Sequence, residues 1–154
     1  MRLTEAMPRE AECLYTLDEI DAVLDKLAKQ LNRDYAGKNP LLLCVMNGAV
    51  ITMGQLLTKL NFALQIDYIH ASRYGDNTTG GELVWQAQPQ TALNGRHVLL
   101  IEDIFDEGHT LVALRRFCHQ QGALSVACLA LADKQHSRKT GQQPEYIGVT
   151  VADR

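Results

Sequence analysis

Apolar residues near the start of the chain recur at spacings of three and four, which is the period of one helix face. The residues in this series are Leu17, Ile20, Leu24, Leu27 and Leu31. Thr16 and Glu19 stand three residues apart where the series begins, a spacing typical of a capping box. The pattern predicts a helix from Leu17 to Asn32.

Four later segments are continuous apolar runs of the kind that form strands buried on both faces of a sheet. They are Leu41 to Val45, Val98 to Ile101, Ser125 to Ala132 and Tyr146 to Val151. Helical spacing follows the first two runs. One helix is predicted from Ala49 to about Leu60, packing through Ile51, Leu56, Leu57 and Leu60. The other begins at Thr110 and places on one face Leu111, Leu114, Arg115 and Cys118. This alternation predicts an α/β fold, with helices flanking a mostly parallel sheet.

The segment from Phe62 to Ala71 alternates between apolar and polar residues, which predicts a strand with one more polar face. Its apolar positions are Leu64, Ile66 and Tyr68. A short strand is predicted to return at Leu83 to Trp85. Between the two strands, Ser72 to Gly81 is rich in Gly, Thr, Asn and Asp, so we expect a mobile hairpin tip that could close over a site.

Three of the predicted strands end in polar residues at what would be one edge of the sheet. These ends are Met46-Asn47-Gly48, Glu102-Asp103 and Asp133-Lys134. Ligands bind at the carboxyl ends of parallel strands, so the three ends predict one site. Each motif also has a purely structural explanation. Asp103, Asp106 or Thr110 could cap a helix, and Asp133 with Lys134 could form an exposed ion pair.

The neighbouring carboxylates Glu102 and Asp103 carry more weight, because like charges repel unless cations or hydroxyl donors lie between them. A ribose diol or a magnesium-bound sugar phosphate would fill that role. The following turn leads into a helix N-terminus, whose free N–H groups can bind phosphate. Asp106 in this turn could act as a general base or hydrogen-bond a protonated ring nitrogen. Lys134 could donate to a carbonyl oxygen.

Composition narrows the class of protein. The 154 residues are 46% hydrophobic and 21% charged, which suits a single globular domain. A net charge of −3 argues against nucleic acid as the main partner. The cysteines are far apart and have no metal-ligand spacing, so we expect reduced core residues; they are Cys13, Cys44, Cys118 and Cys128. No apolar run approaches the roughly 18 residues that span a bilayer, so we expect no membrane contact and a cytoplasmic location.

The stretch Ile101 to Thr110, IEDIFDEGHT, resembles the phosphoribosyl pyrophosphate signature of type I phosphoribosyltransferases. Leu131 to Lys134, Arg138 and Pro144 to Gly148 resemble the hypoxanthine-guanine branch of that family. The resemblance implies the type I phosphoribosyltransferase fold with a flexible hairpin lid. It also implies a purine salvage enzyme that transfers the phosphoribosyl group from phosphoribosyl pyrophosphate (PRPP) to hypoxanthine or guanine, giving IMP or GMP and pyrophosphate. Mg²⁺ would be the cofactor, and the protein would be a homodimer or homotetramer.

The same resemblance implies a role for each site residue. Glu102 and Asp103 would hold the ribose hydroxyls, directly or through Mg²⁺. Asp106 would be the catalytic residue and would face N7 of the purine, while Lys134 would read the 6-oxo group. The 5′-phosphate would be bound by Asp106, Glu107, Gly108, His109 and Thr110. Pyrophosphate would be bound by Arg138 and by Asn47 and Gly48. The last two belong to the loop Met46-Asn47-Gly48, which in relatives often contains a non-proline cis peptide bond. The lid residues would be Arg73 and Tyr74.

Three positions depart from the family pattern. Asn47 stands where relatives often have a basic residue, Arg73 where the lid usually has serine, and Glu107 where Thr or Ser commonly contacts phosphate. These departures leave open a second reading, a non-catalytic regulator of this fold that binds a nucleotide and controls RNA or DNA. The sequence also stops at Arg154, before the aromatic residue that stacks on the purine in relatives. We therefore expect residues 1–154 to be a single domain truncated at its C-terminus.

Overall fold

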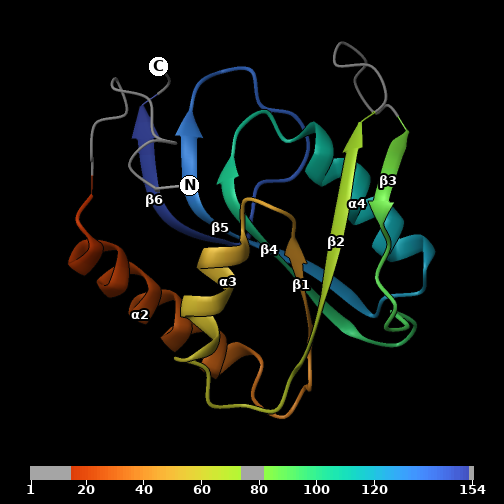
Figure 1. The fold of residues 1–154 in the computed structure, drawn as a ribbon, viewed down its shortest axis with the longest axis horizontal. Helices are drawn as coiled ribbons and strands as arrows, with labels where there is room; N and C mark the ends of the chain where they lie inside the picture. The colour runs from red at the N-terminus through yellow and green to blue at the C-terminus, as the bar shows by residue number, and fades with distance from the viewer. Residues whose placement is uncertain (1–14, 74–81, 153–154) are drawn as a thin grey trace.

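The computed structural model describes residues 15–73 and 82–152 and contains a six-stranded sheet in the order β3-β2-β1-β4-β5-β6 (Figure 1). The strands are β1 (Leu41–Val45), β2 (Gln65–Arg73), β3 (Leu83–Ala87), β4 (His97–Phe105), β5 (Ser125–Gln135) and β6 (Tyr146–Ala152). β3 runs antiparallel to β2, and the other neighbouring pairs are parallel. The predicted α/β fold is confirmed.

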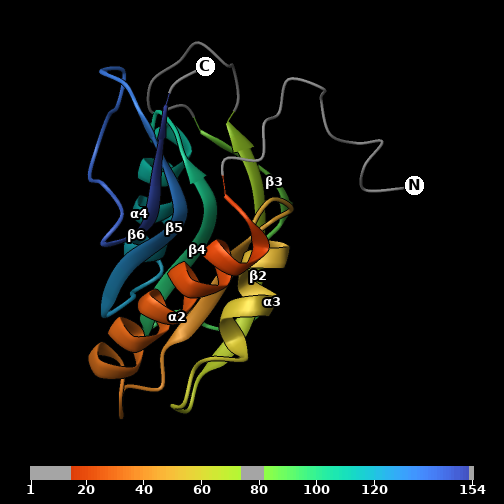
Figure 2. The same cartoon turned by 90° about the vertical axis from the view of Figure 1, so that its left-hand side faces the viewer.

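Helices cover both faces of the sheet (Figure 2). Helices α2 (Leu17–Asp34) and α3 (Val50–Leu57) lie on one face, and α4 (His109–Gln120) lies on the other. Successive residues of a strand point to opposite faces. In β1, Leu42 therefore packs into the α2–α3 core, while Leu41 and Leu43 pack with α4.

The first helix begins where its capping box predicts. Thr16 Oγ1 accepts from the backbone N–H of Glu19 at 3.1 Å, and Glu19 Oε1 accepts from the backbone N–H of Thr16 at 3.2 Å. The helix continues two residues beyond Asn32, to Asp34. The predicted strand Leu41 to Val45 matches β1, and each of its residues is buried.

Two details of the next segment differ from the prediction. α3 is shorter than predicted, and Ile51 is 65% exposed, while Met53 and Leu56 are buried. In β2, Ile69 is buried, whereas the predicted apolar positions Ile66 and Tyr68 are exposed. The register aligns Ile66 with Leu42, so it lies on the α3 side of the sheet. α3 packs against β1 and β4 and leaves this part of β2 uncovered.

β4 and β5 are both longer than predicted. Their ladder continues from Glu102 opposite Ala130 to Phe105 opposite Asp133. Glu102 and Asp103 are therefore part of a strand and not of a turn, because the neighbouring strand extends equally far and pairs with them. Asp133 and Lys134 likewise lie within β5, paired with β6. The turn itself spans residues 106–108.

The predicted hairpin is present in its two arms. Ser72 pairs with Val84 and Arg73 with Leu83 in an antiparallel ladder. Its tip, including the predicted lid residue Tyr74, lies outside the described residues, as does Cys13. No helix within the described part of the chain combines the length and apolar character needed to cross a membrane.

Candidate functional site

A cavity of about 490 Å³ opens at the carboxyl ends of β1 and β4 and the start of α4. Its walls include Gly48, Glu102, Asp103 and residues 106–111, so the structure brings together the acidic pair, the turn and the helix N-terminus. Asn47, Lys134 and Arg138 are not among its lining residues. The peptide bond between Met46 and Asn47, at the rim, is cis.

The turn before α4 depends on Gly108, which has a φ of +92°. A side chain is strained in this backbone conformation, and a Cβ here would also lie 2.5 Å from the carbonyl oxygen of Thr140. Gly108 is the N-cap of α4, and no side chain of the described residues caps it. The first helical hydrogen bond runs from Val112 N to Gly108 O, so the preceding N–H groups are available to a phosphate.

The acidic pair lies in the wall of the same cavity. Burial, reinforced by the neighbouring Asp103 carboxylate, raises the pKa of Glu102 to about 8. Asp103 Oδ1 accepts from the backbone N–H of Ile104 at 2.8 Å. A Cβ on Gly48 would lie 2.5 Å from Asp103 Oδ2, so the β1 loop can approach this carboxylate because it has glycine there.

The raised pKa of Glu102 predicts pH-dependent stability. Glu102 keeps its proton in the folded protein between its ordinary pKa of 4.5 and about 8, whereas the unfolded chain loses it. Stability from this group is thus complete below pH 4.5 and is lost as the pH rises toward 8. Between pH 5 and pH 8, we expect the protein to lose roughly 3 kcal/mol of unfolding free energy relative to Glu102→Gln. Urea unfolding without ligand measures this difference, and parallel pH curves for the two proteins would contradict it.

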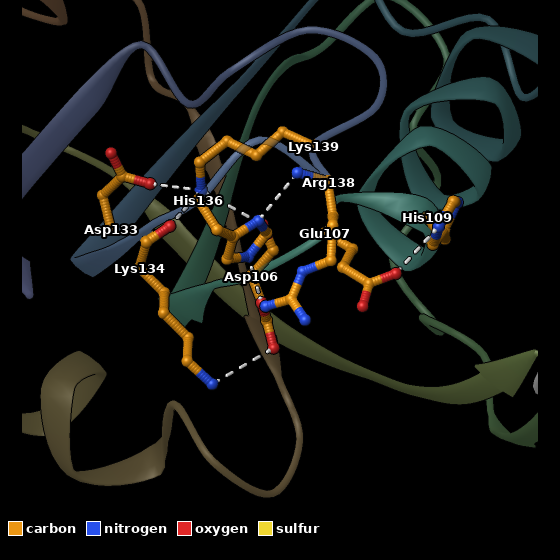
Figure 3. A network of polar contacts seen from close by, with 8 residues as sticks. All are labelled: Asp106, Glu107, His109, Asp133, Lys134, His136, Arg138 and Lys139. Atoms are coloured by element: carbon orange, nitrogen blue, oxygen red, sulfur yellow. Dashed lines mark hydrogen bonds and ion pairs between the residues drawn. The ribbon is translucent and has the colours of Figure 1, made fainter. Parts of the chain in front are cut away.

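The Asp106 carboxylate is held by two side chains that come from the end of β5 and the loop after it (Figure 3). His136 Nε2 lies 2.5 Å from Asp106 Oδ1, and Lys134 Nζ lies 3.8 Å from Asp106 Oδ2. The hydrogen bond from His136 is the largest cause that lowers the pKa of Asp106, and the positive charges of Lys134 and Arg138 add to it. Asp106 is therefore ionised near neutral pH.

Lys139 ties the same loop to the strand ends. Its ammonium group donates to Asp133 Oδ1 at 2.7 Å, to the Lys134 carbonyl at 2.5 Å and to the Asp106 carbonyl at 3.1 Å. It also lies 4.4 Å from the centre of the Phe105 ring, within the range of a cation–π contact. All three ammonium protons thus have acceptors, which fixes residues 136–140 against the turn.

Glu107 was the unexpected acidic residue beside the phosphate turn. Its Oε1 lies 3.2 Å from Nε2 of His109. Nδ1 of that ring is buried and has no partner among the described residues. The Glu107 carboxylate is therefore directed to the side chain of the first residue of α4.

Sequence reasoning missed His136 and Lys139, although both contact the predicted residue Asp106. The sequence signal was a polar, basic stretch after β5, without any spacing to distinguish its members. The structure places Lys134 beside Asp106 as well, whereas Arg138 contacts His136 through its backbone N–H at 3.1 Å.

The residues present can hold Mg²⁺ only in part. Within residues 15–73 and 82–152, no group of three or more His, Cys, Asp or Glu side chains could hold a metal ion. Glu102 and Asp103 are a pair of oxygen donors, and a cation bound to them would replace the proton that burial and the Asp103 carboxylate favour on Glu102. Mg²⁺ commonly binds to one or two carboxylates together with substrate oxygens, and this donor set fits that arrangement.

Comparisons with known proteins agree on one family. A model of the phosphoribosyl transferase domain matches residues 12–153. The chain is 37% identical to the hypoxanthine-guanine phosphoribosyltransferase of Streptococcus thermophilus over 135 residues, 87% of this chain and 75% of that protein. It is 35% identical to the hypoxanthine-guanine-xanthine phosphoribosyltransferase of Tritrichomonas foetus, over 100% of this chain and 85% of that protein.

Solved structures give the same result. A hypoxanthine phosphoribosyltransferase from Staphylococcus aureus superposes with a TM-score of 0.87 at 28% identity, covering 93% of this chain and 78% of that one. A hypoxanthine-guanine-xanthine phosphoribosyltransferase superposes with a TM-score of 0.84 at 34% identity, covering 94% and 83%.

Proposed function

This chain belongs to the phosphoribosyltransferase domain family, in its hypoxanthine-guanine branch, and we propose on that basis that it is a purine salvage enzyme. It transfers the 5-phosphoribosyl group from PRPP to hypoxanthine or guanine, giving IMP or GMP and pyrophosphate. The observation that carries the proposal is the meeting of the Glu102–Asp103 pair, Asp106 and the N-terminus of α4 around one cavity. Nothing in this site or in these relatives favours a non-catalytic regulator.

The proposed binding mode follows from the order of donors and acceptors around the cavity. N–H groups of residues 107–110 bind the 5′-phosphate, together with the Thr110 hydroxyl. Glu102 and Asp103 face the ribose hydroxyls. Asp106 and Lys134, whose charged groups lie 3.8 Å apart, address neighbouring atoms of the base. N7 and O6 lie side by side on one edge of guanine. Asp106 can accept the proton of N7 while Lys134 donates to O6.

The remaining assignments also stay proposals. Asn47, Gly48 and Arg138 bind pyrophosphate, and Arg73 with Tyr74 belongs to the lid. Glu102 and Asp103 would hold Mg²⁺ together with substrate oxygens. When bound, the ion neutralises negative charge that develops on the departing pyrophosphate.

The test is nucleotide formation by the purified protein with PRPP, Mg²⁺ and one base at a time. We expect IMP from hypoxanthine and GMP from guanine, and no AMP from adenine. Binding of GMP is measured in parallel by calorimetry. Nucleotide binding without product from any base would support the regulator instead, and the absence of both would overturn the proposal.

We further propose that the protein forms a homodimer or homotetramer through the uncovered face beside α3. Val50, Ile51, Ile66 and Tyr68 are between 46% and 65% exposed there. α3 itself contains no charged residue, so the α3 helix of a second copy would bring no like charge against it. Ile51→Lys is expected to shift the mass measured by light scattering toward the monomer. An unchanged mass, or a monomeric wild type, would contradict this assignment.

We propose a cytoplasmic location. Cys44, Cys118 and Cys128 are buried and free, as in proteins of reducing compartments.

A further inference from the structure

His136 occupies a position that a surface loop residue rarely has. It directly follows β5, yet its side chain is only 5% exposed. Both ring nitrogens have partners. Nδ1 lies 3.1 Å from the backbone N–H of Arg138, and Nε2 lies 2.5 Å from Asp106 Oδ1. A backbone N–H can only donate, so Nδ1 must be the acceptor, and the proton of the neutral ring is on Nε2.

The loop that carries His136 is fixed to the turn at two further points. Thr140 donates its backbone N–H to the Glu107 carbonyl at 2.7 Å, and Lys139 donates to the Asp106 carbonyl at 3.1 Å. The loop backbone also packs on Gly108, where a Cβ would meet Thr140 O. The position of the imidazole relative to Asp106 is therefore set by the backbone on both sides of the contact.

We propose that His136 is a positioning residue for Asp106, which it holds by donating Nε2–H to Oδ1. This inference rests on the proposed function, in which Asp106 accepts the proton of the incoming purine. With Oδ1 occupied, Oδ2 is the oxygen left to meet the base, and it lies beside Lys134 Nζ. A carboxylate on an exposed turn would otherwise rotate freely, so the contact selects one orientation before the substrate arrives.

The electrostatic surroundings agree with this role. The charged or titratable groups that act on Asp106 are His136, Lys134 and Arg138, and all three favour its ionised form. Lys139 reaches the backbone carbonyl of the same residue, and Glu107 is engaged with His109. The imidazole therefore favours the ionised form of the carboxylate, which is the form that can accept a proton.

The test compares His136→Phe, which keeps a buried ring without its donor, with His136→Gln, which keeps an N–H donor. His119→Gln, on the exposed last turn of α4, is the matched control. We expect His136→Phe to raise the pKa of Asp106 and to lower kcat/KM about tenfold. The pKa is measured by ¹³C NMR of the carboxyl carbon. We expect His136→Gln to keep kcat/KM within about threefold of the wild-type value and to keep the titration of Asp106 close to that of the wild type. The control should change neither quantity.

A loss in His136→Gln as large as or larger than the loss in His136→Phe would show that the ring matters and not its N–H donor, and would overturn the proposal, as would an unchanged Asp106 titration in His136→Phe. In the wild type, ¹⁵N NMR must show the proton of His136 on Nε2, and a proton on Nδ1 instead would also overturn it. These two spectra need no turnover. If the wild type makes no nucleotide from any base, the proposed function fails, while the spectra still decide whether His136 holds Asp106.

Discussion

Asp106→Asn is expected to lower kcat at least 100-fold while changing the KM for PRPP less than about threefold. Proton transfer by a positioned side chain contributes about 10²–10⁴ to a rate, and an amide cannot accept the proton of the purine. Asparagine keeps the size of the side chain and an oxygen that can still accept from His136 Nε2. The substitution therefore removes the base with little disturbance of the turn. Steady-state kinetics with hypoxanthine and guanine measure both constants.

Asp18→Asn is a matched control, because Asp18 is an exposed residue in the first turn of α2. Its kinetic constants should equal those of the wild type. If Asp106→Asn retains its kcat, the carboxylate is not the proton acceptor. If it raises the KM for PRPP and leaves kcat alone, the side chain serves sugar-phosphate binding instead.

Arg115→Met is expected to reduce the free energy of unfolding by about 3 kcal/mol. Arg115 is 8% exposed and pairs with Glu145 through two hydrogen bonds, of 2.7 and 3.1 Å. It also donates to the carbonyls of Val126 and Gln143, so one side chain joins α4, β5 and the segment that leads into β6. Removing it leaves a partly buried carboxylate without its main partner, a large penalty that methionine packing does not offset.

Arg116→Met is the control for this prediction, because the neighbouring residue is exposed. We expect it to change the free energy of unfolding by less than about 0.5 kcal/mol. Urea unfolding measures both variants against the wild type. Equal stabilities of the two variants would show that the Arg115–Glu145 pair contributes no more than a surface charge does.

The elements with one clear periodicity could be predicted from the sequence. The capping box and the leucine series located α2 to within two residues, and the continuous run Leu41 to Val45 located β1. Strand ends were harder to predict. Glu102 and Asp103 look like a turn because charged residues usually leave a sheet, but β5 extends past them and its ladder with β4 continues to Phe105. The expectation that Ile66 is buried was wrong. Alternation shows that a strand has two different faces, but it does not show which part of a face a helix will cover.

The part of the site that could be predicted is the part made of residues contiguous in the sequence. Residues 102–110 are contiguous, so a strand, a turn and a helix N-terminus could be inferred together. His136 is 30 residues from Asp106, and their contact depends on the path of the loop after β5. No local pattern encodes that path, because it is fixed by Lys139 and by the Thr140–Glu107 hydrogen bond. Long-range polar contacts of this kind appear only once the strands have been aligned.

The raised pKa of Glu102 also bears on how fast the substrate arrives. The sequence from Glu102 to Glu107 contains four carboxylates, which suggests four negative charges beside a pocket that must bind a highly anionic sugar pyrophosphate. Glu102, whose pKa is raised to about 8, is mostly neutral near pH 7. A second, Asp106, is flanked by Lys134 and Arg138. The approaching anion therefore meets a weaker repulsive field than four full negative charges would produce, and repulsion of that kind would slow diffusional encounter.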